Sequence, residues 1–67
     1  MNLDTDMPQV IVYAAAGKTA EQHHLLLKKI TEAVVASYEI PAEIVTVQII
    51  EAPVHLKAKG GIRFCDR

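Results

Sequence analysis

The sequence is short of the residues that usually hold very small folds together. Its 67 residues include one cysteine, Cys65, and no tryptophan. A single cysteine excludes a disulfide within the chain. The histidines do not supply a metal centre instead, because His23 and His24 are adjacent and point about 100° apart on a helix, and neither they nor His55 follow a standard zinc spacing. We therefore expect no metal site and a free Cys65 thiol.

The sequence also lacks long runs of one residue type. It has no run of basic residues and no aromatic platform, and its formal net charge is −1, which argues against nucleic-acid binding. No apolar stretch is long enough to cross a bilayer. The first residues lack the basic segment and apolar core of a secretory signal. We therefore expect a cytoplasmic protein that does not enter the membrane.

Apolar residues, in contrast, are abundant. Hydrophobic residues make up 51% of the chain, although a domain of this size buries only about 60% of the surface that its unfolded chain exposes. Small domains without disulfides or metals commonly gain stability by oligomerisation. The run Leu25-Leu26-Leu27 is also wider than one helical stripe requires. Both features predict self-association.

The pattern along the chain predicts a single domain over residues 8–67. Residues 1–7 are mostly polar and are expected to be an N-terminal extension or a stretch upstream of the true start. β-branched residues predict strands over 8–14 and 43–51, and Gly60-Gly61 predicts a short hairpin near the end of the chain. A strand, a helix and a strand in this order give parallel neighbours joined by a right-handed crossover. The expected class is α+β, a β-α-β subunit whose two-stranded sheet needs other copies for stability.

The helix between the two strands has clear end signals. Thr19 and Gln22 are spaced as a capping box, and Pro41 disfavours a helical residue before it, so the helix should end near Tyr38. We expect one face of this helix to be apolar, with Leu26, Ile30, Ala33, Val34 and Ser37 at its centre and Leu27, Val35 and Tyr38 widening it. His23 and His24 are expected on the surface of its first turn.

A family resemblance rests on Met7-Pro8, the strand after it, the segment Gly17-Lys18-Thr19-Ala20-Glu21-Gln22 that opens the helix, the strand ending in Glu51, and Gly60-Gly61. A phosphate-binding loop at Gly17-Lys18-Thr19 is excluded because the earlier glycine of that motif is missing. The arrangement resembles the 4-oxalocrotonate tautomerase family over residues 7 to about 62. The resemblance implies the tautomerase (split β-α-β) fold, assembly into hexamers or trimers of dimers, and cofactor-independent catalysis by an amino-terminal proline.

The resemblance also assigns candidate site residues. It places Pro8 at the position of the general base and Lys18 where the best-known members carry an arginine that binds a substrate carboxylate. Thr46 falls at the position of a second arginine. Lys57, with Leu56 beside it, falls at the position of the pocket aromatic. Lysine retains charge but not the bidentate geometry of arginine. The resemblance implies a small unsaturated or 2-keto/2-hydroxy carboxylic acid as the substrate, and the departures at Lys18 and Thr46 argue against 4-oxalocrotonate itself.

Two functional hypotheses follow for Pro8. If translation starts at Met7 and the methionine is removed, Pro8 has a basic secondary amine and the chain is a tautomerase. If Met1 is retained, Pro8 is a tertiary amide, and the chain is a non-catalytic or hetero-oligomer subunit of the same family. A third, purely structural interpretation is that Pro8 only opens a strand and that Lys18 is a solvated turn residue.

Overall fold

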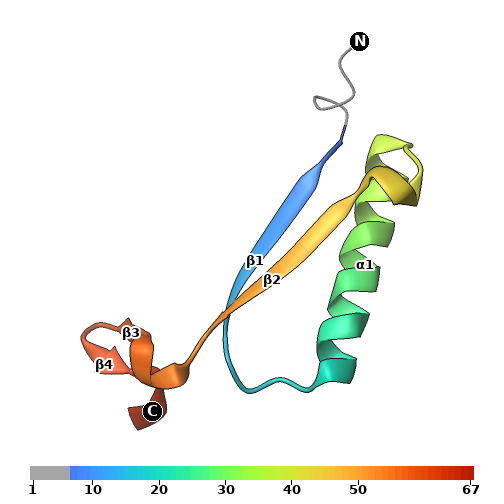
Figure 1. Ribbon diagram of the computed structural model, residues 1–67. Coiled ribbons are helices and arrows are strands. Elements are labelled where there is room, and N and C mark those ends of the chain that lie inside the picture. The colour runs from blue at the N-terminus through green and yellow to red at the C-terminus, as the bar shows by residue number, and fades with distance from the viewer. Residues whose placement is uncertain (1–6) are drawn as a thin grey trace.

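The computed structural model describes residues 7–67 (Figure 1). Residues 1–6, most of the expected extension 1–7, lie outside the described residues. The regular elements are β1 (Gln9–Ala15), α1 (Ala20–Tyr38), β2 (Thr46–Ala52), β3 (Ala58–Lys59) and β4 (Ile62–Arg63). Single 3₁₀ turns lie at Ala42–Ile44, Val54–Leu56 and Phe64–Asp66. None of the helices in residues 7–67 is both long and apolar enough to cross a membrane.

The main sheet consists of β1 and β2. They pair in parallel, in a register that runs from Gln9 opposite Thr46 to Ala15 opposite Ala52. Helix α1 connects the two strands and lies along one face of the sheet beside β2 (Figure 1). The β-α-β subunit with parallel strands and a short C-terminal hairpin is thus confirmed.

Residues alternate between the two faces of this sheet. Val10, Val12, Val47 and Ile49 are half-buried, as expected for the side that α1 covers, whereas Gln9, Ile11, Tyr13, Thr46, Gln48 and Ile50 are exposed. No described residue is fully buried within this single chain. The exposed Ile11, Tyr13 and Ile50 leave an apolar area uncovered on the open face. One chain alone therefore lacks a closed core, which agrees with the expectation that other copies complete it.

The ends of α1 follow their local chemistry. The Thr19 hydroxyl accepts a hydrogen bond from the Gln22 backbone N–H at 3.1 Å, and the Gln22 side chain accepts one from the Thr19 N–H at 2.9 Å. The predicted capping box is confirmed. At the other end, Glu39 adopts the left-handed conformation (φ 56°), and its N–H donates to the Val35 carbonyl at 2.9 Å. This residue ends the helix two positions before Pro41.

Two details of the sequence-based prediction are wrong. The second strand was expected from residue 43, but Ala42–Ile44 form a 3₁₀ turn in which the Val45 N–H donates to the Ala42 carbonyl at 3.0 Å. This turn reverses the chain after the helix, so β2 begins only at Thr46. The expected helix face is only partly right, since Leu27 and Val35 from its widened edge are half-buried, but Tyr38 is exposed. The half-buried residues of α1 are His23, Leu27, Ile30, Thr31, Val34 and Val35, whereas Ala33 and Ser37 are exposed and Leu26 remains 39% exposed.

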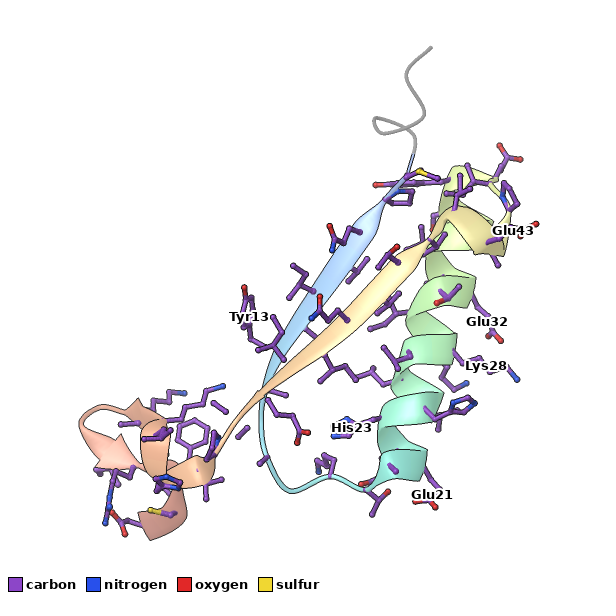
Figure 2. The ribbon with its side chains drawn as sticks, in the orientation of Figure 1. Tyr13, Glu21, His23, Lys28, Glu32 and Glu43 are labelled. Carbon is purple, nitrogen blue, oxygen red and sulfur yellow. The ribbon has the colours of Figure 1, made fainter. Side chains whose placement is uncertain are left out.

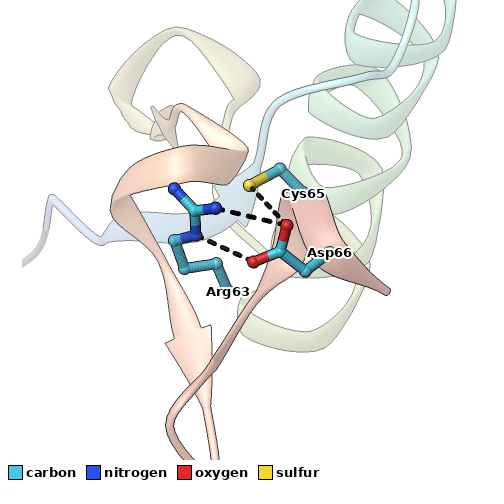
Figure 3. A network of polar contacts seen from close by, with 3 residues as sticks. All are labelled: Arg63, Cys65 and Asp66. Atoms are coloured by element: carbon cyan, nitrogen blue, oxygen red, sulfur yellow. Dashed lines mark hydrogen bonds and ion pairs between the residues drawn. The ribbon is translucent and has the colours of Figure 1, made fainter.

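The C-terminal hairpin projects away from the main sheet (Figure 1). Gly60 and Gly61 have φ values of 63° and 80°, which suit the two-residue turn of a tight hairpin. The strands β3 and β4 pair antiparallel across this turn, as the Gly-Gly pair predicted. Close to the chain end, Arg63 donates two hydrogen bonds to the Asp66 carboxylate, and the Cys65 thiol lies 3.8 Å from the same carboxylate (Figure 3).

Candidate functional site

Pro8 lies immediately before β1, at the amino end of the sheet. It is half-buried, and its carbonyl oxygen accepts a hydrogen bond from the Thr46 N–H at 3.1 Å. Pro8 and Thr46 are therefore neighbours. Met7 precedes Pro8 and is 44% exposed. In the chain as described, the Pro8 nitrogen is part of the Met7–Pro8 peptide bond and has no basic lone pair.

Lys18 lies at the opposite end of β1, in the turn that leads into α1. Gly17 adopts φ 134°, a backbone conformation that is unfavourable for any residue with a Cβ atom. The Ala16 N–H donates to the Ala52 carbonyl at 2.9 Å, which ties this turn to the end of β2. The main chain around Lys18 is thus held against the carboxyl end of the sheet.

The structure does not bring Pro8 and Lys18 together within one chain. A β-strand rises about 3.3 Å per residue, so the path from Pro8 to Ala15 spans roughly 23 Å. Leu56 and Lys57 follow the carboxyl end of β2. Because β1 and β2 are parallel, their carboxyl ends meet at one end of the sheet. Lys18, Leu56 and Lys57 therefore lie toward that end, and Pro8 and Thr46 lie at the other.

Lys57 belongs to a cluster that sequence reasoning missed. Its ammonium nitrogen lies 5.4 Å from the centre of the Phe64 ring, and the Arg67 guanidinium lies 5.6 Å from the same ring. The Phe64 N–H donates to the Lys57 carbonyl at 2.7 Å. Lys57 is half-buried, whereas Leu56 is 72% exposed. An aromatic ring thus lies beside the position where the resemblance expected one, supplied by the only phenylalanine of the chain.

His23 is the clearest departure from expectation at the site. It was predicted to be a surface residue of the first helical turn, but its side chain points from α1 toward the sheet (Figure 2) and is only 21% exposed. Its Nε2 lies 3.4 Å from Oε2 of Glu51, near the end of β2. His23 also lines a pocket of about 310 Å³ together with Lys18 and four other residues, Ala14, Gln22, Leu26 and Ile49. His23 stands four positions before Leu27 and seven before Ile30, so these three residues share the half-buried face of α1.

The fold and its proline-led first strand define a class of small β-α-β subunits, and comparison with known proteins identifies the family. The model of a family described as "Tautomerase enzyme" matches residues 8–55. The chain belongs to this tautomerase family.

Individual relatives agree with this assignment. A protein of Bradyrhizobium diazoefficiens named "probable tautomerase" is 41% identical over 61 residues, which cover 91% of each chain. The solved structure of YwhB, a homologue of 4-oxalocrotonate tautomerase, is 35% identical with a TM-score of 0.79, and the match covers 90% of this chain and 98% of that one. A heterohexameric 4-oxalocrotonate tautomerase from Chloroflexus aurantiacus is 25% identical with a TM-score of 0.82, over 90% and 97% of the two chains. The tautomerase fold is therefore confirmed.

Proposed function

We propose that this protein is a cofactor-independent keto–enol tautomerase that acts on a small unsaturated or 2-keto/2-hydroxy carboxylic acid. Pro8 is its general base once cleavage before Pro8 leaves a secondary amine. The observation that carries the proposal is the position of Pro8. The match to the tautomerase family begins at this residue, which stands at the open amino end of the sheet with its carbonyl anchored to Thr46.

The chemistry of the amine suits this role. An ordinary α-amino group has a pKa of about 7.7–8.0, and a general base works best when its pKa lies near the working pH. A free amine at Pro8 would take the hydroxyl proton of an enol acid and deliver a proton to the carbon next to the forming carbonyl group, which gives the 2-keto acid. The reverse step takes the proton from that carbon. No redox step or group transfer is involved, so the reaction needs only a base and a group that stabilises negative charge.

Lys18 is the candidate for the second group, because a cation can pair with the substrate carboxylate. Since Pro8 and Lys18 are at opposite ends of one chain, a site that uses both requires two chains. The opposite charges at the two ends of the chain favour such a contact between chains. Residues 57–67 at the hairpin end contain four Lys or Arg residues and one acid, whereas Glu43 lies near the Pro8 end (Figure 2).

The first test combines an intact mass with kinetics. We expect the protein expressed from its natural gene context to begin at Pro8 and to ketonise phenylenolpyruvate or a 2-hydroxymuconate-type dienol. Pro8→Ala should lower kcat/KM by about 10²–10⁴-fold, the usual contribution of a general base, with an unchanged oligomer size as the control for folding. An unchanged rate in Pro8→Ala would exclude Pro8 as the base.

The alternative is a subunit of a hetero-oligomer that is itself inactive. Thr46, beside Pro8, carries no charge, and the similar protein from Chloroflexus aurantiacus is a heterohexamer. In this case Pro8 remains blocked, and a second small chain of the same family copurifies when the protein is isolated from its natural host. A pure homo-oligomer with good turnover would exclude this alternative.

A further inference from the structure

The pocket beside Lys18 has the composition of a small-molecule site. It lies between the first turns of α1 and the two main strands, and its volume is about 310 Å³, at the lower end of the range for ligand pockets. Ala14, Leu26 and Ile49 supply apolar walls, and Gln22 supplies a neutral polar group. A ligand with a short apolar body and one polar end fits such walls.

Three ionisable groups determine the charge of this pocket. Lys18 and His23 line it, and Glu51 faces His23 from β2, with Oε2 3.4 Å from Nε2. The Nε2 atom is shielded from solvent and has no hydrogen-bond partner among the described residues. The strand β1 contributes only Ala14 to the pocket, and Glu21 on α1 points away from it (Figure 2).

The sum of these charges depends on His23. When His23 is neutral, Lys18 and Glu51 cancel, and the pocket offers an anion no net attraction. When His23 is protonated, it neutralises Glu51 and leaves the charge of Lys18 unopposed. Histidine is the side chain that ordinarily changes charge between about pH 5 and pH 8.

We propose that this pocket binds a small monocarboxylic acid with an apolar body, and that His23 controls its affinity by balancing Glu51. The carboxylate of the ligand faces Lys18, and its apolar body lies against Ala14, Leu26 and Ile49. The identification of this ligand with the substrate rests on the proposed tautomerase function. The pocket then selects apolar monocarboxylates over dicarboxylates, because among the described residues that line it Lys18 is the one lysine or arginine, and a charged His23 is paired with Glu51.

Cinnamate is a suitable probe because it has this shape and cannot tautomerise. Its affinity for the full-length protein can be measured from NMR shifts of the Ala14 and Ile49 amides at about pH 5.5 and about pH 8. Carboxylic acids titrate near pH 4, so cinnamate stays ionised at both values. We expect binding to be roughly tenfold weaker at the higher pH, because one unit of positive charge is lost near the ligand. Equal affinity at the two pH values, or no shift at these amides, would overturn the proposal.

Matched variants separate His23 from the general charge of the protein. His23→Gln should bind cinnamate weakly at both pH values, and Glu51→Gln should bind it tightly at both, because Lys18 is then never neutralised. His24→Gln is the control, since His24 is adjacent in sequence but exposed, and it should retain the wild-type pH dependence. If His23→Gln and His24→Gln behave alike, His23 does not control the pocket.

A further variant distinguishes this proposal from the proposed function. Pro8→Ala should bind cinnamate with the wild-type pH dependence even when its turnover is lost. Suppose that the wild-type protein binds cinnamate in this manner but ketonises no enol acid. This result would refute the proposed function and would still support the proposed ligand site. Turnover without pH-dependent binding would refute the pocket alone.

Discussion

At the scale of single residues, Lys18 and Pro8 carry the proposed chemistry in different ways. The role of Pro8 depends on a covalent event, since its nitrogen is an amide in the chain that includes Met7. The role of Lys18 depends on position, because Gly17 and the Ala16–Ala52 hydrogen bond hold its turn at the carboxyl end of the sheet. A substitution at Lys18 therefore tests the charge without altering the base.

We predict that Lys18→Met raises the KM for an enol carboxylate by about tenfold or more, because an ion pair with a desolvated carboxylate is lost. Lys18→Arg should retain activity and lower the KM, since guanidinium binds a carboxylate in a bidentate manner. Steady-state kinetics on phenylenolpyruvate would measure both effects. Lys28→Met, on the outer side of α1 (Figure 2), is the control and should leave the KM unchanged.

At the scale of elements, α1 is well specified at its start and strained at its end. Thr19 and Gln22 satisfy two backbone N–H groups of the first turn. At the other end, Glu39 occupies the left-handed conformation that glycine usually adopts at this position. An L-residue with a Cβ atom costs about 1–2 kcal/mol there. The sequence has no glycine at this point, so Pro41 signalled the end of the helix but not the strained conformation of Glu39.

We predict that Glu39→Gly stabilises the protein by about 1 kcal/mol, because it relieves this backbone strain. Glu32→Gly is the matched control. It makes the same exchange in the middle of α1, where glycine should destabilise by about 1 kcal/mol. Urea denaturation at one fixed protein concentration would measure both, since the midpoint of an oligomer depends on concentration. A destabilised Glu39→Gly variant would contradict the strain argument.

At the scale of the whole molecule, the main feature is an apolar face of the sheet that no other element of the described chain covers. Ile11, Tyr13 and Ile50 are 42%, 71% and 38% exposed and gather on the side of the sheet opposite α1. Contiguous apolar patches on a soluble protein commonly mark contacts with other chains. The separation of Pro8 from Lys18 also favours contact between chains, because a site that uses both residues requires more than one copy.

We predict that the chain self-associates through this face and that Tyr13→Asp dissociates the assembly, because a carboxylate there cannot be buried against another copy without a large desolvation penalty. Sedimentation velocity would detect the loss as a shift toward the monomer mass. Lys28→Asp places the same new charge on the outer side of α1 and should leave the assembly unchanged. If both variants sediment as wild type, the open sheet face is not the contact surface.

The sequence by itself determined the elements and their order. The capping box at Thr19, the glycine pair at Gly60 and the alternation along both strands are local features, and each is set by hydrogen bonds or allowed backbone angles within a few residues. The motif around Lys18 also carried the family resemblance. For these reasons the β-α-β subunit, its parallel pairing and its hairpin could be predicted.

The tertiary structure alone decided the rotation of α1 and the contacts that depend on it. His23 faces the sheet more than Leu26 does. This orientation depends on how the helix packs against the two strands, and no local sequence pattern specifies the packing. His23 contacts Glu51, and Phe64 lies beside Lys57. Each contact forms because the chain reverses direction between the two residues. These distances come from packing between separate elements, so only the folded chain could establish them.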